Sequence, residues 1–270
     1  MEKVFEGGHQ ITAPCFDDKV LIISSMGSGE IFRIDQSDSN VTPTRLSGSP
    51  SSIQFNSEGL MHVADMSAKS ILSFDGSELS TIVSEFEGKQ FKGPNSLIFA
   101  SDGTMYFTDS GPLGETTLFS PGGSLFSVDN EGKHLQPIIL NSLAHPSGIA
   151  LSADDSTLFV CETLQNRLLR GVQSPPGVWH FSVFHQFSGS LGPSCVALHP
   201  ETQMIYVGMF DIAGPHSSKN SGSIMVLSSE GEYVETLLVP GVQITGLTFS
   251  SDARLFVTES STNTVYCTQC

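Results

Sequence analysis

The sequence predicts an all-β fold: a six-bladed β-propeller of four-stranded blades, formed by a single domain over residues 1–270. One basis for this prediction is a unit of two apolar strands joined by a polar turn, which occurs six times along the chain. Another is the interval between the units, which is typical of propeller blades. The last is a strand-like segment at the N-terminus that completes the final unit.

Each unit begins with a small polar residue four positions before an apolar anchor. A turn rich in Asp, Gly and Glu follows, and then an apolar strand, as in HPSGIALSADDSTLFVCET (145–163). The leading residues are Thr12, Ser51, Asn95, Ser147, Ser194 and Thr245, and the anchors are Phe16, Phe55, Phe99, Leu151, Leu198 and Phe249. Successive leading residues are 39, 44, 52, 47 and 51 positions apart.

Two further strands follow each pair. Third strands are predicted at 30–35, 70–75, 124–129, 166–172, 223–228 and 264–270, and fourth strands at 41–47, 79–86, 135–140, 179–185 and 233–239. Only five fourth strands follow the pairs, and the sixth is EKVFEGG (2–8), at the opposite end of the chain. We therefore expect the N-terminal strand to complete the last blade. This closure hides a sheet edge that would otherwise pair with other chains.

Composition narrows the function classes. The net charge of −16, from 12 basic and 28 acidic residues, repels phosphate backbones and anionic lipids. We therefore expect neither a nucleic acid nor a membrane partner. No run of about 18 apolar residues is present, and the N-terminus lacks an apolar export segment. The expected location is intracellular, in the cytoplasm, where five cysteines fit reduced thiols better than disulfides.

The repeats resemble the SMP-30/gluconolactonase-like propellers, whose relatives include the strictosidine synthase-like and diisopropylfluorophosphatase-like proteins. The resemblance extends over essentially the whole chain. It is strongest in PNSLIFASDGTMYFTD (94–109) and PSGIALSADDSTLFVCET (146–163), followed by HVADM (62–66). The likeness identifies a superfamily but no single activity, because propellers host many functions.

The resemblance also implies a cation in the central channel of the metal-dependent members, held by side chains that lead the first strands. Such a cation polarises a carbonyl or phosphoryl oxygen and helps to activate water. The family's four ligand positions fall here on Thr12, Asn95, Ser147 and Ser194. Only the asparagine is retained, and neither carboxylate is, although calcium prefers anionic oxygens. We therefore expect no cofactor, with calcium or another divalent cation as the alternative.

Other acidic residues of the chain could replace the missing cation ligands. Asp65, Asp109, Glu162 and Glu259 end four second strands, and this recurrence predicts a structural role, such as accepting backbone N–H bonds in the following turn. Glu6, in the closing strand, lies near the channel only if the alignment slips. Asn95 and Glu6 are thus the only candidate metal ligands.

The remaining reactive residues predict no catalytic centre. Ser147 follows His145, but no strained GxSxG elbow is present, so we expect its hydroxyl to make an ordinary hydrogen bond in the channel wall. Cys267 and Cys270 lie three apart on a strand and therefore point to opposite sides. Cys161 and Cys195 are expected to be buried and inert.

Two long connections between second and third strands, 110–123 and 212–222, are predicted to lie beside the leading residues. Long loops at a channel mouth are candidate recognition surfaces. Their candidate contact residues are the apolar Leu118 and Phe119 and the polar His216 and Lys219. We expect a protein partner or an uncharged small ligand on this face.

Three functions fit these observations. The expectation is a non-catalytic binding or assembly module, because the repeat pattern is intact while three ligand positions are lost. The first alternative is a lactone or ester hydrolase with a rebuilt or metal-poor central site. The second alternative is a strictosidine synthase-like enzyme, since those relatives lack the metal arrangement.

Overall fold

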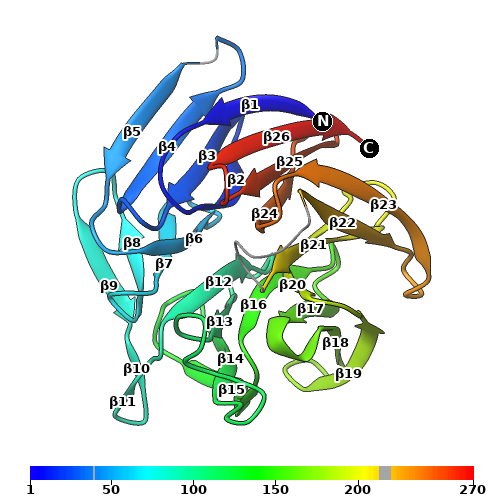
Figure 1. Ribbon diagram of the computed structural model, residues 1–270. Coiled ribbons are helices and arrows are strands. Elements are labelled where there is room, and N and C mark those ends of the chain that lie inside the picture. The colour runs from blue at the N-terminus through cyan, green and yellow to red at the C-terminus, as the bar shows by residue number, and fades with distance from the viewer. Residues whose placement is uncertain (39, 213–219) are drawn as a thin grey trace.

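The computed structural model describes residues 1–38, 40–212 and 220–270, and it confirms the six-bladed propeller (Figure 1). Each blade is a four-stranded antiparallel sheet. Blade 1 contains β2 (Ile11–Asp17), β3 (Val20–Ser25), β4 (Glu30–Asp35) and β5 (Val41–Arg45). Blade 2 contains β6 (Pro50–Phe55), β7 (Met61–Asp65), β8 (Ser70–Phe74) and β9 (Leu79–Val83). Blade 3 contains β12 (Pro94–Phe99), β13 (Met105–Asp109), β14 (Gly123–Val128) and β15 (Leu135–Leu143).

The other three blades repeat this order. Blade 4 contains β16 (Pro146–Leu151), β17 (Thr157–Glu162), β18 (Arg167–Gln173) and β19 (Trp179–Gln186), with the 3₁₀ turn η1 (Thr163–Gln165). Blade 5 contains β20 (Leu191–Leu198), β21 (Ile205–Asp211), β22 (Ser221–Leu227) and β23 (Tyr233–Pro240). Blade 6 contains β24 (Ile244–Phe249), β25 (Arg254–Glu259), β26 (Thr264–Gln269) and β1 (Glu2–Glu6).

The N-terminal strand closes the ring as predicted. β1 pairs antiparallel with β26, so the two ends of the chain lie in one sheet (Figure 1). The ring of Phe5 on β1 also packs against Phe32 of blade 1, with ring centroids 5.2 Å apart. The closing strand therefore contacts both blades that meet at the seam.

One predicted strand is wrong in extent. The fourth strand expected at 79–86 ends at Val83, and Glu85–Phe86 (β10) instead forms a small hairpin with Lys89–Gln90 (β11). Glu87 and Gly88, between β10 and β11, both have positive φ, at 52° and 74°. This is the conformation of a tight two-residue hairpin turn, which reverses the chain before a longer strand can form.

The first strands form the innermost ring: β2 contacts β6 and β24, and the others contact their neighbours in turn. Glycines permit this close approach, since a Cβ on Gly148 would lie 2.5 Å from the Cα of Cys195 on the next blade. The face on which the first strands begin, called here the upper face, also carries the connections from second to third strands. The lower face carries the turns from first to second and from third to fourth strands.

The hydrophobic core lies between the blades, in six clusters that each join two neighbours. Edge-to-face ring pairs recur in these clusters between a second strand and the anchor of the next blade. The pairs are Tyr206 with Phe249 at 5.1 Å, Phe256 with Phe16 at 5.2 Å, and His62 with Phe99 at 4.9 Å. Among the described residues, no helix has the length and hydrophobicity of a membrane span.

Candidate functional site

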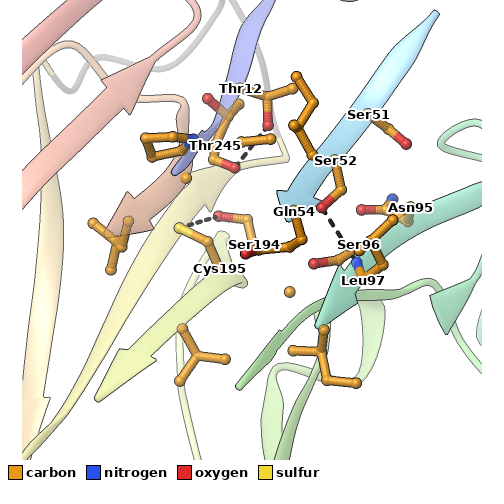
Figure 2. Close-up of a pocket in the computed structure, with 18 residues that line it drawn as sticks. Thr12, Ser51, Ser52, Gln54, Asn95, Ser96, Leu97, Ser194, Cys195 and Thr245 are labelled. Carbon is orange, nitrogen blue, oxygen red and sulfur yellow. Dashed lines mark hydrogen bonds between the residues drawn. The ribbon is translucent and has the colours of Figure 1, made fainter. Parts of the chain in front are cut away.

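A cavity of about 70 Å³ lies on the propeller axis, enclosed by the six first strands (Figure 2). A volume of this size holds a few water molecules or one polar group of a ligand, because each water needs roughly 10–15 Å³. Five of the six leading residues line it: Thr12, Ser51, Asn95, Ser194 and Thr245. Ser147 does not, and Gly148 and Ile149 form that part of the wall.

The leading hydroxyls link neighbouring blades. Each of four donates to the backbone carbonyl of the residue directly before the next leading residue, which places an inter-blade hydrogen bond at the axis. These four form the hydroxyl ring: Ser51 to Pro94 (2.8 Å), Ser147 to Pro193 (3.4 Å), Ser194 to Ile244 (2.5 Å) and Thr245 to Ile11 (2.7 Å). Each such bond contributes about 1 kcal/mol.

The hydroxyl ring is interrupted at two leading residues: Thr12, whose hydroxyl donates back to Thr245 of blade 6, and Asn95. The side-chain amide of Asn95 donates to Ser110 Oγ at 3.0 Å, within its own blade. The link from blade 3 to blade 4 comes instead from Thr108, whose hydroxyl donates to the carbonyl of Ser147 at 2.8 Å. Asn95 thus differs from the other five leading residues in carrying two N–H donors, only one of which is used in the described part of the chain.

The four positions that the resemblance assigns to a cation do not fit one. The Ser147 hydroxyl is buried against Thr163 Oγ1 at 2.7 Å, outside the cavity lining, and the Thr12 hydroxyl donates to the carbonyl of Thr245. Among the described residues, no carboxylate or histidine lines the cavity, and none of them form a group of three or more His, Cys, Asp or Glu able to bind a metal. Calcium takes six to eight oxygens and draws its affinity from anionic ones. Neutral hydroxyls and the two amides that line the cavity, Gln54 and Asn95, do not provide them.

Glu6, the second candidate ligand, lies far from the axis in its blade. It sits on β1, the outermost strand of blade 6, and pairs with Thr264. Its carboxylate forms an exposed ion pair with Lys3 at 2.8 Å and does not line the cavity. The structure therefore does not bring Glu6 and Asn95 together.

The acids that end the second strands have the structural role expected of them. All four are buried, and two of them accept backbone N–H groups in the following turn: Asp65 from Ala68 and Glu259 from Thr262. A second set of donors, which the sequence did not predict, comes from the segment that leads into the same blade. These bonds run from Ser49 to Asp65, Gly93 to Asp109, Ala144 to Glu162 and Gln243 to Glu259.

His145 lies on the upper face, two residues before Ser147, but it is not paired with that serine. Its backbone N–H donates to Thr116 of the neighbouring loop, and its side chain is 8% exposed. Its Nδ1 is buried without a hydrogen-bond partner in the described structure. Burial lowers the pKa of His145 to about 4, so the imidazole is neutral at pH 7.

Replacing His145 with Asn is expected to flatten the dependence of stability on acid. Because the folded-state pKa is depressed, the wild-type chain has its full stability above pH 6.5 and loses roughly 3 kcal/mol as the pH falls from 6.5 to 4. Urea unfolding of both proteins between pH 4 and pH 7.5 measures this. His62, whose pKa is also lowered by burial, and carboxylates with shifted pKa values contribute to the slope that remains. Equal slopes for the two proteins would contradict the assignment.

The cysteines offer no nucleophile. All five are free, and Cys161 and Cys195 are buried as expected. Burial raises the pKa of Cys195 to about 12, so the thiol stays protonated although it lines the cavity.

The loop expected to recognise a ligand contains three strongly exposed apolar residues: Leu118 and Phe119, which the sequence singled out, and Leu113. Leu118 is 51% exposed and Phe119 is fully exposed, on the connection from β13 to β14 at the upper face. The same connection contacts blade 4 through Thr116 and His145. The other two candidates, His216 and Lys219, lie outside the described residues.

The sequence and the fold of this chain are similar to those of known proteins. Residues 12–261 match the family described as the SMP-30/gluconolactonase/LRE-like region. The lactonase drp35 of Staphylococcus saprophyticus is 28% identical over 254 residues, covering 88% of this chain and 72% of the relative. A gluconolactonase from Xanthomonas campestris superposes with a TM-score of 0.82 over 98% of this chain and 87% of that chain, at 17% identity. The calcium-binding protein regucalcin of Agrobacterium tumefaciens superposes with a TM-score of 0.79 over 98% and 92%, also at 17%.

The sequence relatives contradict the expectation of a non-catalytic binding or assembly module. That expectation equated the loss of carboxylate ligands with the loss of activity. A lactonase nevertheless matches the chain over nearly the whole propeller, which favours the hydrolase alternative. Losing anionic oxygens weakens cation binding, but it leaves the axial cavity and its hydrogen-bonding groups in place.

Proposed function

Because the chain belongs to the SMP-30/gluconolactonase/LRE-like family, we propose that it is an enzyme that hydrolyses lactones at the axial cavity. The observation that carries this proposal is the similarity to the lactonase drp35 over 88% of the chain. In the proposed reaction, water adds to the carbonyl carbon and the ring C–O bond breaks. The ring oxygen takes a proton to become a hydroxyl group, and the carboxylic acid formed loses its proton to solvent.

The size and polarity of the cavity suit one end of a lactone. Only the carbonyl end fits within about 70 Å³, so the rest of the ring lies toward the upper face. In the proposed site, the second N–H of Asn95, which lines the cavity, donates to the carbonyl oxygen as it becomes negative. The hydroxyl ring gives its protons to backbone carbonyls, so Ser194 and Thr245 present oxygen lone pairs that can accept from the attacking water.

The charge of the protein favours release of the product. A lactone is neutral and feels little of the surface potential, whereas the hydroxy acid carries a negative charge at pH 7. The net charge of −16 repels that anion, and no lysine or arginine of the described ranges lines the cavity to retain it. An uncharged substrate entering from the loop-bearing face agrees with the small ligand expected there.

Asn95→Ala is expected to lower kcat/KM for lactone hydrolysis about a hundredfold, the usual cost of removing one donor to a developing oxyanion. Turnover is followed with a pH indicator on a panel of aliphatic and sugar lactones, since each opened ring releases a proton. Glu6→Gln, on the outermost strand, is the control and should leave turnover unchanged. No turnover of any lactone would refute the function. Turnover that is unaffected by Asn95→Ala would refute the site.

The same assay tests the role of a cation. The donor groups at the axis do not fit a divalent ion, so turnover should survive dialysis against EDTA. Activity that disappears on chelation and returns with calcium would show that a cation takes part in hydrolysis.

A further inference from the structure

A second, larger cavity lies away from the axis, between blades 2 and 3 on the lower face. It has a volume of about 360 Å³, within the roughly 300–1,000 Å³ of small-molecule sites. The turns β6–β7, β12–β13 and β14–β15 form its rim, and β7, β12 and β13 form its floor. This cavity is called the blade 2–3 groove, and its defining residues are Glu58, His62, Phe99, Asp102, Asp129 and Glu131.

His62, on the floor, departs from the internal repeat. In the sequence, His62 directly follows the second-strand residue that pairs with the anchor of blade 2. At the equivalent position of every other blade, the second strand has an aromatic or aliphatic side chain. The equivalent residues are Ile22, Tyr106, Phe159, Tyr206 and Phe256. His62 keeps the edge-to-face contact with the next anchor, Phe99, but it replaces an apolar ring with one that carries two nitrogens.

The hydrogen bonding of His62 leaves one nitrogen available. Nδ1 lies 3.1 Å from the carbonyl of Leu60, so it carries the proton and donates. Nε2 therefore holds a lone pair, and it makes no hydrogen bond within the described part of the chain. The side chain is only 7% exposed, yet it lines the groove. Burial lowers the pKa of His62, which keeps the ring neutral at pH 7.

The rim is negatively charged. Of the residues that the structure describes, four carboxylates line the groove, and no lysine or arginine does. One of them, Glu131, is paired with the exposed Lys133. Asp129 accepts backbone N–H groups from Lys133 and His134, and these bonds fix the carboxylate in place without neutralising it. Between rim and floor the walls are apolar, with Ile82, Met105 and Val128 beside Phe99.

We propose that the blade 2–3 groove binds a linear aliphatic amine with two or more ammonium groups. One ammonium donates to Nε2 of His62 at the floor, and the methylene chain lies against Phe99 and Met105. The second ammonium pairs with the carboxylates of Glu58 and Asp102 at the rim. A metal ion is a poorer fit, because no metal-binding group of three His, Cys, Asp or Glu exists in the described ranges.

Calorimetry with spermidine on the full chain tests the proposal. His62→Phe should weaken binding about tenfold or more, because a charge-assisted hydrogen bond is lost while the ring contact with Phe99 is kept. Phenylalanine already fills this position in blades 4 and 6, so the variant should melt like the wild type. A double variant, Glu58→Gln with Asp102→Asn, should weaken binding similarly without touching the core.

Glu235→Gln, an exposed position on β23 of blade 5, is the control for removing a surface carboxylate outside the groove and should bind spermidine as the wild type does. The proposal is overturned if spermidine gives no binding heat or if His62→Phe binds it as tightly as the wild type. It is also overturned if Glu235→Gln weakens binding as much as the groove variants, since the amine would then bind the acidic surface at large. Lactone turnover is not needed for any of these readouts, so this test is independent of the proposed hydrolase activity.

Discussion

A chain lacking residues 1–7 is expected to lose on the order of 5 kcal/mol of folding stability and to self-associate. The truncation removes β1, and with it the half-buried Val4 and Phe5, each contributing about 1–1.5 kcal/mol. It also removes the hydrogen-bond ladder to β26, at about 1 kcal/mol per bond. A loss of this size is comparable with the whole stability of a domain, roughly 5–15 kcal/mol.

Thermal melting and light scattering measure the two effects of this truncation. The melting temperature should fall by on the order of 10 °C or more, and the open edge of β26 should produce dimers or larger species. Phe5→Ala is the control, because it removes one ring and leaves the strand pairing intact. A monomeric truncated chain that melts within a few degrees of the full chain would show that β1 does not close the ring.

Glu259→Ala is expected to destabilise the protein by roughly 3 kcal/mol. The carboxylate is fully buried and accepts the backbone N–H groups of Gln243, Ser261 and Thr262, and the hydroxyls of the latter two. Alanine leaves the buried donors without partners, each at a cost of about 1–3 kcal/mol, while the donors nearer the surface regain water. Urea unfolding at pH 7 gives the difference in free energy.

The control for this change is Glu232→Ala, an exposed position on the turn before β23, which should shift stability by less than about 0.5 kcal/mol. Glu259→Gln should fall between the two, since one carbonyl oxygen remains to accept. If Glu259→Ala unfolds at the same urea concentration as Glu232→Ala, the carboxylate does not hold the incoming segment to the following turn.

The fold could be predicted because the residue types of the repeat have strong preferences for strands or turns. Polar leading residues, apolar anchors and acidic turns recur six times, and the surplus N-terminal strand indicated closure. The extra hairpin at Glu85–Gln90 was not predictable from alternation alone. It depends on positive φ at Glu87, a residue type that seldom adopts it.

The candidate site was only partly predictable. The sequence identified the six leading residues. It did not show that Ser147 is absent from the cavity lining, because this depends on the contact of its hydroxyl with Thr163 in another part of the blade. The hydroxyl ring depends on contacts 43 to 234 residues apart in the chain, which no local pattern encodes. His62 carried a detectable signal, since aligning the second strands shows a histidine where the other blades place an aromatic or aliphatic side chain.

The function predicted from the sequence was wrong because the prediction assumed that a chain without the metal ligands has no activity. Exchanging carboxylates for hydroxyls changes the charge at the axis, but it keeps hydrogen-bonding groups around the same cavity. The chemical type of the ligand atoms predicts which metal ion a site prefers. It predicts less well whether the site turns over a neutral substrate.

The hydroxyl ring also determines how well the residues at the axis tolerate substitution. A single cation would tie the blades together through one shared centre, so losing one ligand would weaken every link at once. Here each link joins one pair of blades and is worth about 1 kcal/mol, so the loss of one leaves the others intact. Leading residues can therefore be exchanged one at a time without collapse of the assembly, which makes this axis a suitable place to engineer new catalytic groups by stepwise substitution.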